Sequence, residues 1–243
     1  MPAVSDTCAV AVMAKAPRVG EVKTRLAPPL SAEEAAALGA AFIQDIAGNI
    51  LAAAEAVAID GFVAYSPPGS EAAFAGLLPE AIRLLPPRGI GLGASLLHAA
   101  DDLLAAGYRA ACLVNADSPT LPTAFLVEAA QALQKPGDRV VLGPAEDGGY
   151  YLIGMKSPHR PLFEGIAWST ERVFDQTLDR AAELALETVI LPRWYDVDDV
   201  ESLDRLRREI LGAGIPGAYG APHTAEFLQR LTAEPGAART LPR

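Results

Sequence analysis

A short segment near the N-terminus concentrates positive charge. Residues 14–26 hold four cations and one acid, a local charge of +3 in a chain whose formal net charge is −10. Ammonium and forked guanidinium groups suit a polyanion such as a diphosphate, although a solvated surface loop would have the same composition. The spacing of glycines and lysine that defines a P-loop is absent. The four cations are Lys15, Arg18, Lys23 and Arg25.

Asp117 comes directly after a short apolar run, within the segment Asn115-Ala116-Asp117-Ser118-Pro119. A carboxylate at this point can bind Mg²⁺ or Mn²⁺ and bridge the ion to phosphate oxygens. Asp-Ser-Pro is also a common turn sequence. Alone, the segment is therefore only a weak indication of a site.

Asp147 belongs to a second acidic segment, residues 143–151, and is followed by Gly148 and Gly149. Paired glycines let the backbone approach a ligand closely while an acid stays within reach. The alternative is a hairpin turn with incidental acids, because Asp-Gly is a common hairpin pair.

A third acidic segment, residues 194–199, holds Asp196, Asp198 and Asp199. The period-two spacing of Asp196 and Asp198 places both carboxylates on one side of an extended segment. The alternative is a helix start capped by Asp198 or Asp199. With three acids present, both interpretations can hold.

Two further features are less specific. Residues 89–93 (GIGLG) resemble a dinucleotide fingerprint only superficially, since they lack the full pattern and its ribose-binding acid. Gly93 there would let a helix N-terminus approach a base or sugar, with a simple helix-entry turn as an equal alternative. Trp168 is a candidate for stacking on an acceptor, or for ordinary packing.

Short β-type runs alternate with longer helical runs along the chain. This alternation predicts an α/β fold with a three-layer, mostly parallel, doubly wound sheet. Ligands bind outside the carboxyl ends of the strands in such sheets, so the charged segments that follow strands would meet at one edge. The expected strands are residues 8–13, 57–65, 82–85, 110–114, 139–142, 150–155 and 188–191, and the expected helices are 31–56, 70–78, 92–106, 122–134, 169–186 and 200–211. The first helix is expected to begin at about Ser31, because Ser31 and Glu34 have the spacing of a capping box.

Composition excludes several classes of protein. With 51% hydrophobic residues the 243-residue chain cannot stay disordered, and no run approaches the roughly 18 uncharged apolar residues of a membrane span. The acidic net charge argues against binding duplex nucleic acid. Cys8 and Cys112 lie in apolar runs, as reduced core thiols do, which indicates a cytoplasmic protein. We expect one domain over residues 1–231 and a loose tail over 232–243.

One cationic and three acidic loops at the same edge of a sheet are stronger evidence for a functional site than any one of these loops alone. A basic patch for a diphosphate and convergent carboxylates for a divalent metal describe a nucleotide-dependent transferase. In such an enzyme the metal neutralises charge on the leaving diphosphate, and the positioning of the two substrates supplies most of the remaining rate enhancement.

The ordered segments AKAPRVGEVKTRLAP, VNADSPTLP, VVLGPAEDGGYYLIG, WST and YDVDDVESL resemble those of a bacterial family of nucleotide-diphospho-sugar transferase-like proteins. That family was first described as a domain of unknown function (DUF2064) and is associated with arsenosugar biosynthesis. The resemblance runs from about Val10 to Leu206 and implies the GT-A fold. The first and last segments are also similar to those of phospholactate guanylyltransferases, which are nucleotidylyltransferases of the same fold.

The resemblance implies roles for individual residues. Family members usually have Gly-Thr-Asp where this chain has Asn115-Ala116-Asp117, so the metal role of the aspartate is retained while the nucleoside contacts differ. Asp147 is either a further metal ligand or the acid–base group. The predicted nucleotide- or phosphate-binding residues are Lys15, Arg18, Lys23, Arg25, Gly93, Gly148 and Gly149, the predicted metal ligands are Asp117, Asp196 and Asp198, and the predicted catalytic residue is Asp147.

These features predict a metal-dependent glycosyltransferase that uses a nucleotide-activated sugar, with Mg²⁺ or Mn²⁺ as cofactor. Asp147 would deprotonate a hydroxyl of a small-molecule acceptor. One alternative is a nucleotidylyltransferase that uses a nucleoside triphosphate and a small phosphorylated acid. Another is a non-catalytic protein that binds sugar nucleotides.

Overall fold

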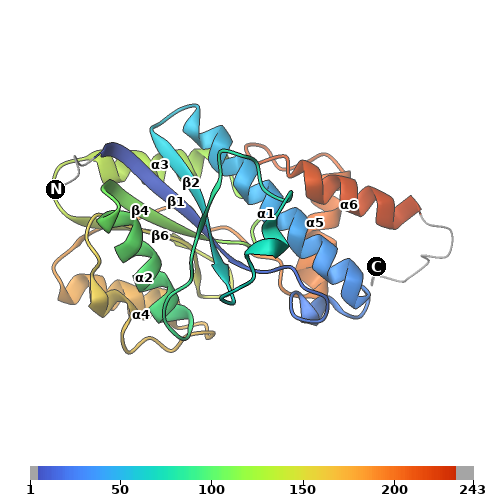
Figure 1. Cartoon of the computed structure of the whole chain (residues 1–243), viewed down its shortest axis with the longest axis horizontal. Coiled ribbons are helices and arrows are strands. Elements are labelled where there is room, and N and C mark those ends of the chain that lie inside the picture. The colour runs from blue at the N-terminus through green and yellow to red at the C-terminus, as the bar shows by residue number, and fades with distance from the viewer. Residues whose placement is uncertain (1–4, 234–243) are drawn as a thin grey trace.

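The structure, a computed structural model, describes residues 5–233. In this part of the chain, seven strands form one sheet in the order β3-β2-β1-β4-β6-β5-β7, which confirms the predicted α/β class (Figure 1). The strands are β1 (Ser5–Lys15), β2 (Ile59–Ser66), β3 (Arg83–Leu85), β4 (Tyr108–Asn115), β5 (Arg139–Pro144), β6 (Tyr150–Met155) and β7 (Glu187–Ile190).

β6 departs from the run of parallel strands and crossovers that the sequence indicated. Residues 145–149 are too few for a crossover, so β5 and β6 form a hairpin and β6 runs antiparallel to both β4 and β5. The other pairings are parallel. The reversed strand brings the 145–149 turn to the sheet edge where β1 and β4 also end.

Helices cover both faces of the sheet. α1 and α3 pack on one face and α2 and α4 on the other, while α5 and α6 pack with α1 beyond the sheet (Figure 1). The helices are α1 (Ala32–Ala54), α2 (Leu92–Ala105), α3 (Thr123–Gln134), α4 (Val173–Glu183), α5 (Val200–Leu211) and α6 (Pro222–Ala233).

Several predicted boundaries differ from the structure, most clearly in the helices. α4 begins at Val173 rather than at Ser169, because Ser169 adopts a left-handed conformation (φ 62°) that cannot continue a helix. The expected helix at 70–78 is only a 3₁₀ turn, Glu71–Phe74. α6 continues to Ala233, and residues 234–243 of the predicted tail lie outside the described residues.

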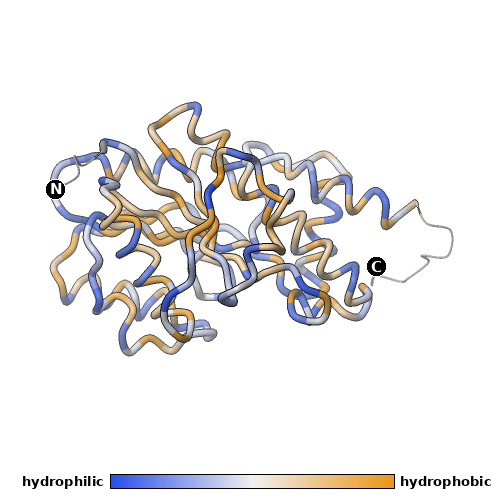
Figure 2. Tube along the Cα trace, in the orientation of Figure 1, coloured by the Kyte–Doolittle hydropathy of each residue, from blue (hydrophilic) through white to orange (hydrophobic). Residues whose placement is uncertain are grey.

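α1 is the central helix of the core. Ser31 and Glu34 form the capping box that their spacing predicted. By length and composition alone α1 could cross a membrane, with a mean hydropathy of 1.4, but 61% of that apolar window is buried inside the protein. Figure 2 shows that the central strands on which α1 packs are also rich in hydrophobic residues. The apolar composition of α1 is therefore accounted for by its packing on β1, β2 and α3.

Asp45 joins α1 to α6. Its buried carboxylate accepts hydrogen bonds from the backbone N–H groups of His223 and Thr224, at 2.9 and 2.8 Å, and from the Thr224 hydroxyl. These N–H groups belong to the first turn of α6, which has no intrahelical acceptors for them. The side chain of one helix thus caps the N-terminus of another, and a negative charge there also suits the helix dipole.

We expect Asp45→Ala to lower the free energy of unfolding by about 2–3 kcal/mol, because it leaves these buried donors without an acceptor. Urea denaturation followed by circular dichroism measures the change. Asp45→Asn is the matched variant. Because it keeps one acceptor oxygen, its free energy of unfolding should fall by about half as much as that of Asp45→Ala. Equal stability of wild type and Asp45→Ala would contradict the capping role.

Candidate functional site

Two adjoining clefts lie at the sheet edge where β1, β4 and the β5–β6 hairpin end. The first, here called the basic cleft, has a volume of about 330 Å³ and takes its cations from the loop after β1. The second, here called the acidic cleft, has a volume of about 440 Å³ and is rich in carboxylates. Met13, Arg25, Asp117 and Asp198 line both. The predicted cations and acids therefore meet in one composite site.

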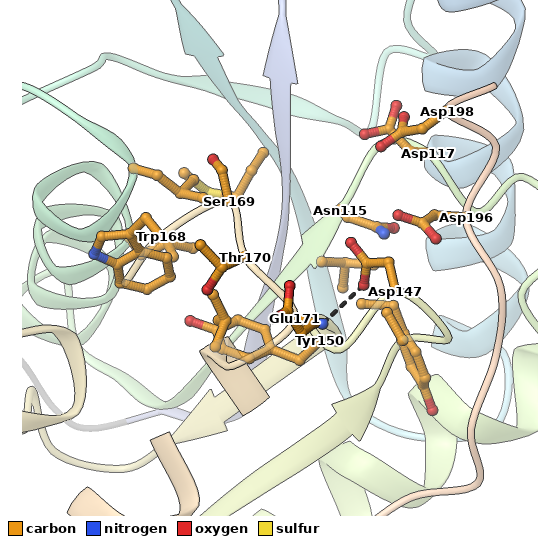
Figure 3. Close-up of a pocket in the computed structure, with 18 of the residues that line it drawn as sticks. Asn115, Asp117, Asp147, Tyr150, Trp168, Ser169, Thr170, Glu171, Asp196 and Asp198 are labelled. Carbon is orange, nitrogen blue, oxygen red and sulfur yellow. Dashed lines mark hydrogen bonds between the residues drawn. The ribbon is translucent and has the colours of Figure 1, made fainter. Parts of the chain in front are cut away.

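The acidic cleft is lined by acids from four loops (Figure 3). Asp117 and Asp198 lie together at one end, Trp168 lies at the other, and Asp147 and Glu171 lie between them. The polar and aromatic residues that line it are Arg25, Asn115, Asp117, Asp147, Tyr150, Tyr151, Trp168, Ser169, Thr170, Glu171, Asp196 and Asp198.

Lys23 connects the two clefts. Its ammonium nitrogen lies 2.5 Å from Asp117 Oδ1 and 3.1 Å from Asp198 Oδ1, and it donates a hydrogen bond to the Val197 carbonyl at 2.6 Å. The Lys23 side chain is 8% exposed, whereas those of Asp117 and Asp198 are 38% and 46% exposed. Burial alone would lower the pKa of Lys23, but the two carboxylates outweigh it and the net pKa is raised. Lys23 is therefore held as a cation.

Further hydrogen bonds, which do not involve Lys23, join the loop after β4 to residues 194–199. Val197 N donates to the Asp117 carbonyl at 2.9 Å, and the Ser118 hydroxyl donates to the Tyr195 carbonyl at 2.9 Å. The loop after β4 and residues 194–199 thus form one unit. Asp199 caps α5 by accepting from Ser202 N, which leaves Asp196 and Asp198 to face the cleft. The helix-start and cleft-lining interpretations of this segment are both correct.

Asp196 lies in the strongest negative field of the site. Burial, then the nearby charges of Asp147, Asp198 and Asp117, raise the pKa of its carboxyl to about 7. A carboxyl group in this position is stabilised by any cation that enters the cleft.

The β5–β6 hairpin positions Asp147. Gly149 N donates to Asp147 Oδ1 at 2.8 Å, which leaves Oδ2 for a ligand. Gly148 has φ 89°, and a Cβ there would come within 2.2 Å of the Glu171 carbonyl oxygen. Only glycine fits this turn, and its absent side chain lets Glu171 approach the hairpin. The hairpin and cleft-lining interpretations of this segment again both hold.

The structure does not bring every predicted residue to the clefts. Lys15 lines the basic cleft while donating to the Glu21 carbonyl at 2.8 Å. Arg18 is exposed and lines neither cleft. Gly93 is buried, and a Cβ there would lie 2.6 Å from Trp168 Nε1, so this glycine makes room for the indole. Gly148 acts through the turn and not by lining a cleft.

Sequence reasoning missed three residues of the acidic cleft. Asn115 Oδ1 and the Tyr150 hydroxyl are buried atoms with no hydrogen-bond partner within the described chain, which is unusual for buried polar groups. Glu171 is exposed and lines the same cleft. The only sequence signal was their position beside segments already singled out, VNADSP, GGYY and WSTE.

Two of the three predicted metal ligands fit a divalent cation. Asp117 and Asp198 both contact the same ammonium group, so one small cation can contact both carboxylates, and carboxylate oxygens are ligands that Mg²⁺ and Mn²⁺ prefer. Within residues 5–233, no three His, Cys, Asp or Glu side chains form a ready metal site. Phosphate oxygens and water would have to complete the coordination, as is usual for Mg²⁺.

Comparisons with known proteins place this geometry in context. The family described as "Uncharacterized protein conserved in bacteria (DUF2064)" matches residues 49–170. A protein from Desulfovibrio desulfuricans G20, provisionally named a nucleotide-diphospho-sugar transferase, is 30% identical over 94% of this chain and 96% of its own, with a TM-score of 0.79. No curated protein matches this chain.

Two more distant structures share the fold. CMP:2-keto-3-deoxy-manno-octonic acid synthetase complexed with CTP is 12% identical, covers 82% of this chain and 96% of its own, and has a TM-score of 0.54. A cytidylyltransferase from Leptospira borgpetersenii serovar Hardjo-bovis (strain JB197) is 10% identical, covers 96% and 97%, and has a TM-score of 0.53.

We expect Lys23→Met to lower the free energy of unfolding by about 1–3 kcal/mol, because it leaves two carboxylates facing each other without their shared cation. The loss should be smaller than for a fully buried pair, since both acids keep contact with water. Urea denaturation without divalent cations measures it. Lys135→Met, at an exposed lysine, is the control and should stay within about 0.5 kcal/mol of wild type. A Lys23→Met protein as stable as the control would refute the bridging role.

Proposed function

This chain belongs to the DUF2064 family of proteins conserved in bacteria, and we propose that it is a metal-dependent glycosyltransferase that uses a nucleotide-activated sugar. One observation carries the proposal: the cations of the β1 loop and the carboxylates Asp117 and Asp198 line one composite site at the carboxyl edge of the sheet. The similarity to the Desulfovibrio protein supports a transferase.

The diphosphate of the donor would lie in the basic cleft, against Lys15 and Arg25. A third cleft of about 470 Å³ adjoins it through Met13 and Lys15 and is lined mainly by apolar residues of 64–68 and 86–92. This third cleft has the size and character to hold the nucleoside. The donor would thus extend from the apolar cleft across the cations toward the acidic cleft.

Asp117 and Asp198 would hold Mg²⁺ or Mn²⁺, and Asp196 lies beside them in the acidic cleft. The bound metal would neutralise charge on the departing diphosphate. Lys23 and Arg25 would add positive charge on the same side of the sugar.

In the proposed reaction an acceptor hydroxyl attacks the anomeric carbon of the donor sugar. The new carbon–oxygen bond forms as the bond from that carbon to the diphosphate breaks, and the electron pair leaves with the nucleoside diphosphate. Asp147 would take the acceptor proton: it is exposed in the acidic cleft, and one of its oxygens is already held by Gly149 N.

We also propose that the protein works in the cytoplasm. Cys8 and Cys112 are buried, and their sulfur atoms lie 3.7 Å apart without a disulfide bond. Buried, unpaired thiols are usual in proteins of a reducing compartment.

We expect a nucleoside diphosphate with Mn²⁺, at about 100 times its dissociation constant, to raise the melting temperature by about 5–10 °C. Asp117→Asn and Asp198→Asn should abolish most of this metal-dependent shift, because each removes half of the proposed ligand set. Differential scanning fluorimetry over a panel of bases and metals measures the effect.

Asp179→Asn is the control, since Asp179 is exposed on α4 and lines neither cleft; it should keep the full shift. If no nucleoside diphosphate or sugar nucleotide stabilises the wild type with either metal, the proposed function is wrong. Unchanged ligand binding in the Asp117→Ala protein would instead favour a non-catalytic binding protein.

We expect the purified protein with Mn²⁺ to release a nucleoside diphosphate from a sugar nucleotide in the presence of an acceptor. Asp147→Asn should lower the rate by about 100-fold or more, the range for a general base. Product analysis by chromatography distinguishes the reactions. Release of pyrophosphate from a nucleoside triphosphate, dependent on a phosphorylated acceptor, would replace sugar transfer with nucleotidylyl transfer.

A further inference from the structure

The middle of the acidic cleft, between the Asp117–Asp198 end and Trp168, holds two acids without salt-bridge partners (Figure 3). Asp147 and Glu171 are both exposed there, and within residues 5–233 neither forms a salt bridge. Among the described residues that line this cleft, Arg25 is the single cation, set against five carboxylates, and it also lines the basic cleft. A divalent metal between Asp117 and Asp198 would leave Asp147 and Glu171 uncompensated.

Two buried polar atoms beside the cleft have no hydrogen-bond partner within the described chain. Asn115 Oδ1 and the Tyr150 hydroxyl are buried without partners, and both residues line the cleft. Asp147 offers one free carboxylate oxygen and Glu171 two, and all of these are acceptors. The exposed carboxylate oxygens of Asp147 and Glu171 therefore favour a ligand that donates hydrogen bonds, and hydroxyl groups supply donors without adding negative charge.

Aromatic and hydroxyl side chains complete this part of the cleft. Trp168 and Tyr150 pack edge to face with ring centroids 6.4 Å apart. Ser169 and Thr170 follow on the same segment and also line the cleft (Figure 3). An aromatic surface bordered by polar acceptors suits a small molecule with apolar C–H faces and several hydroxyl groups.

We infer that the acceptor is a hydroxyl-rich small molecule without an anionic group, and that phosphorylated and carboxylated compounds are rejected. Calling this ligand the acceptor rests on the proposed function. The charge selectivity is a property of the cleft and does not depend on that function. An anionic group placed beside Asp147 and Glu171 would face two like charges, and Arg25 is the single cation among the described residues that line the cleft. Such an acceptor would also set this protein apart from a nucleotidylyltransferase that uses a phosphorylated acid.

The test uses Trp168 as the reporter. The chain has two tryptophans, so Trp194→Phe leaves Trp168 as the single indole, and its fluorescence reports binding in the cleft. The probes are two charge-matched sets: glycerol, glycerol 1-phosphate, glycerate and 3-amino-1,2-propanediol; and glucose, glucose 6-phosphate, gluconate and glucosamine. Each is titrated with and without a nucleoside diphosphate and Mn²⁺.

We expect the neutral member of at least one set to bind at least about tenfold more tightly than its anionic partners, and this gap should narrow as salt is added. Equal or tighter binding of an anionic member overturns the inference. So does the absence of a Trp168 response to both neutral compounds.

Glu171→Lys tests the wall directly. It should shift the preference toward the anionic members by about tenfold or more. Glu80→Lys makes the same change of charge at an exposed position that does not line the cleft, and should leave the preference unchanged. Identical preferences in both variants overturn the inference. Failure of nucleotide binding in the thermal-shift assay would refute the proposed function but not this inference. The Trp168 titration without nucleotide measures binding in the acidic cleft by itself.

Discussion

The ion pairs of Lys23 with Asp117 and Asp198 are the interaction on which the site depends. They join three segments that are far apart in the sequence: the loop after β1, the loop after β4, and residues 194–199. A buried ammonium group can be accommodated only if acceptors surround it, and here two carboxylates and the Val197 carbonyl do so. Because the cation needs all of these partners, it fixes the relative positions of the segments more than it adds to stability.

This arrangement also divides the site by charge. On the β1 side, Lys15, Lys23 and Arg25 face the basic cleft, while on the side of the β5–β6 hairpin Asp147 and Glu171 face the acidic one. Asp117 and Asp198 stand on the boundary and belong to both. A donor with a polyanionic part and an uncharged part can align with this gradient, its phosphates toward the cations. The same gradient favours release of an anionic product toward the cations and not across the acidic cleft.

The sequence was sufficient for features that depend on local chemistry. Alternating apolar runs predicted the strands and their shared edge, Ser31 and Glu34 predicted the start of α1, and the acids after strands were found because a doubly wound sheet gathers its loops. What it could not supply are contacts across the fold. Lys23 was predicted to contact phosphates, but its present partners are 94 and 175 residues away. Gly93 was assigned to a ligand because a short motif does not reveal that Trp168 packs against it. The unpartnered Asn115 and Tyr150 atoms are visible only once burial is known.

The antiparallel β6 determines how Asp147 is anchored in the site. A parallel strand in this place would need a long crossover, whereas the five-residue hairpin turn fixes Asp147 between two core strands. At Gly148 the turn touches the backbone of Glu171, and the Gly148 carbonyl accepts from Phe174 N at 2.9 Å in the first turn of α4. The hairpin and the segment that carries Trp168 and Glu171 are therefore one packed unit. Both carboxylates are thus anchored through packed backbone, so the proposed exclusion of anions would depend on the packing of the hairpin as well as on the charges of the two acids.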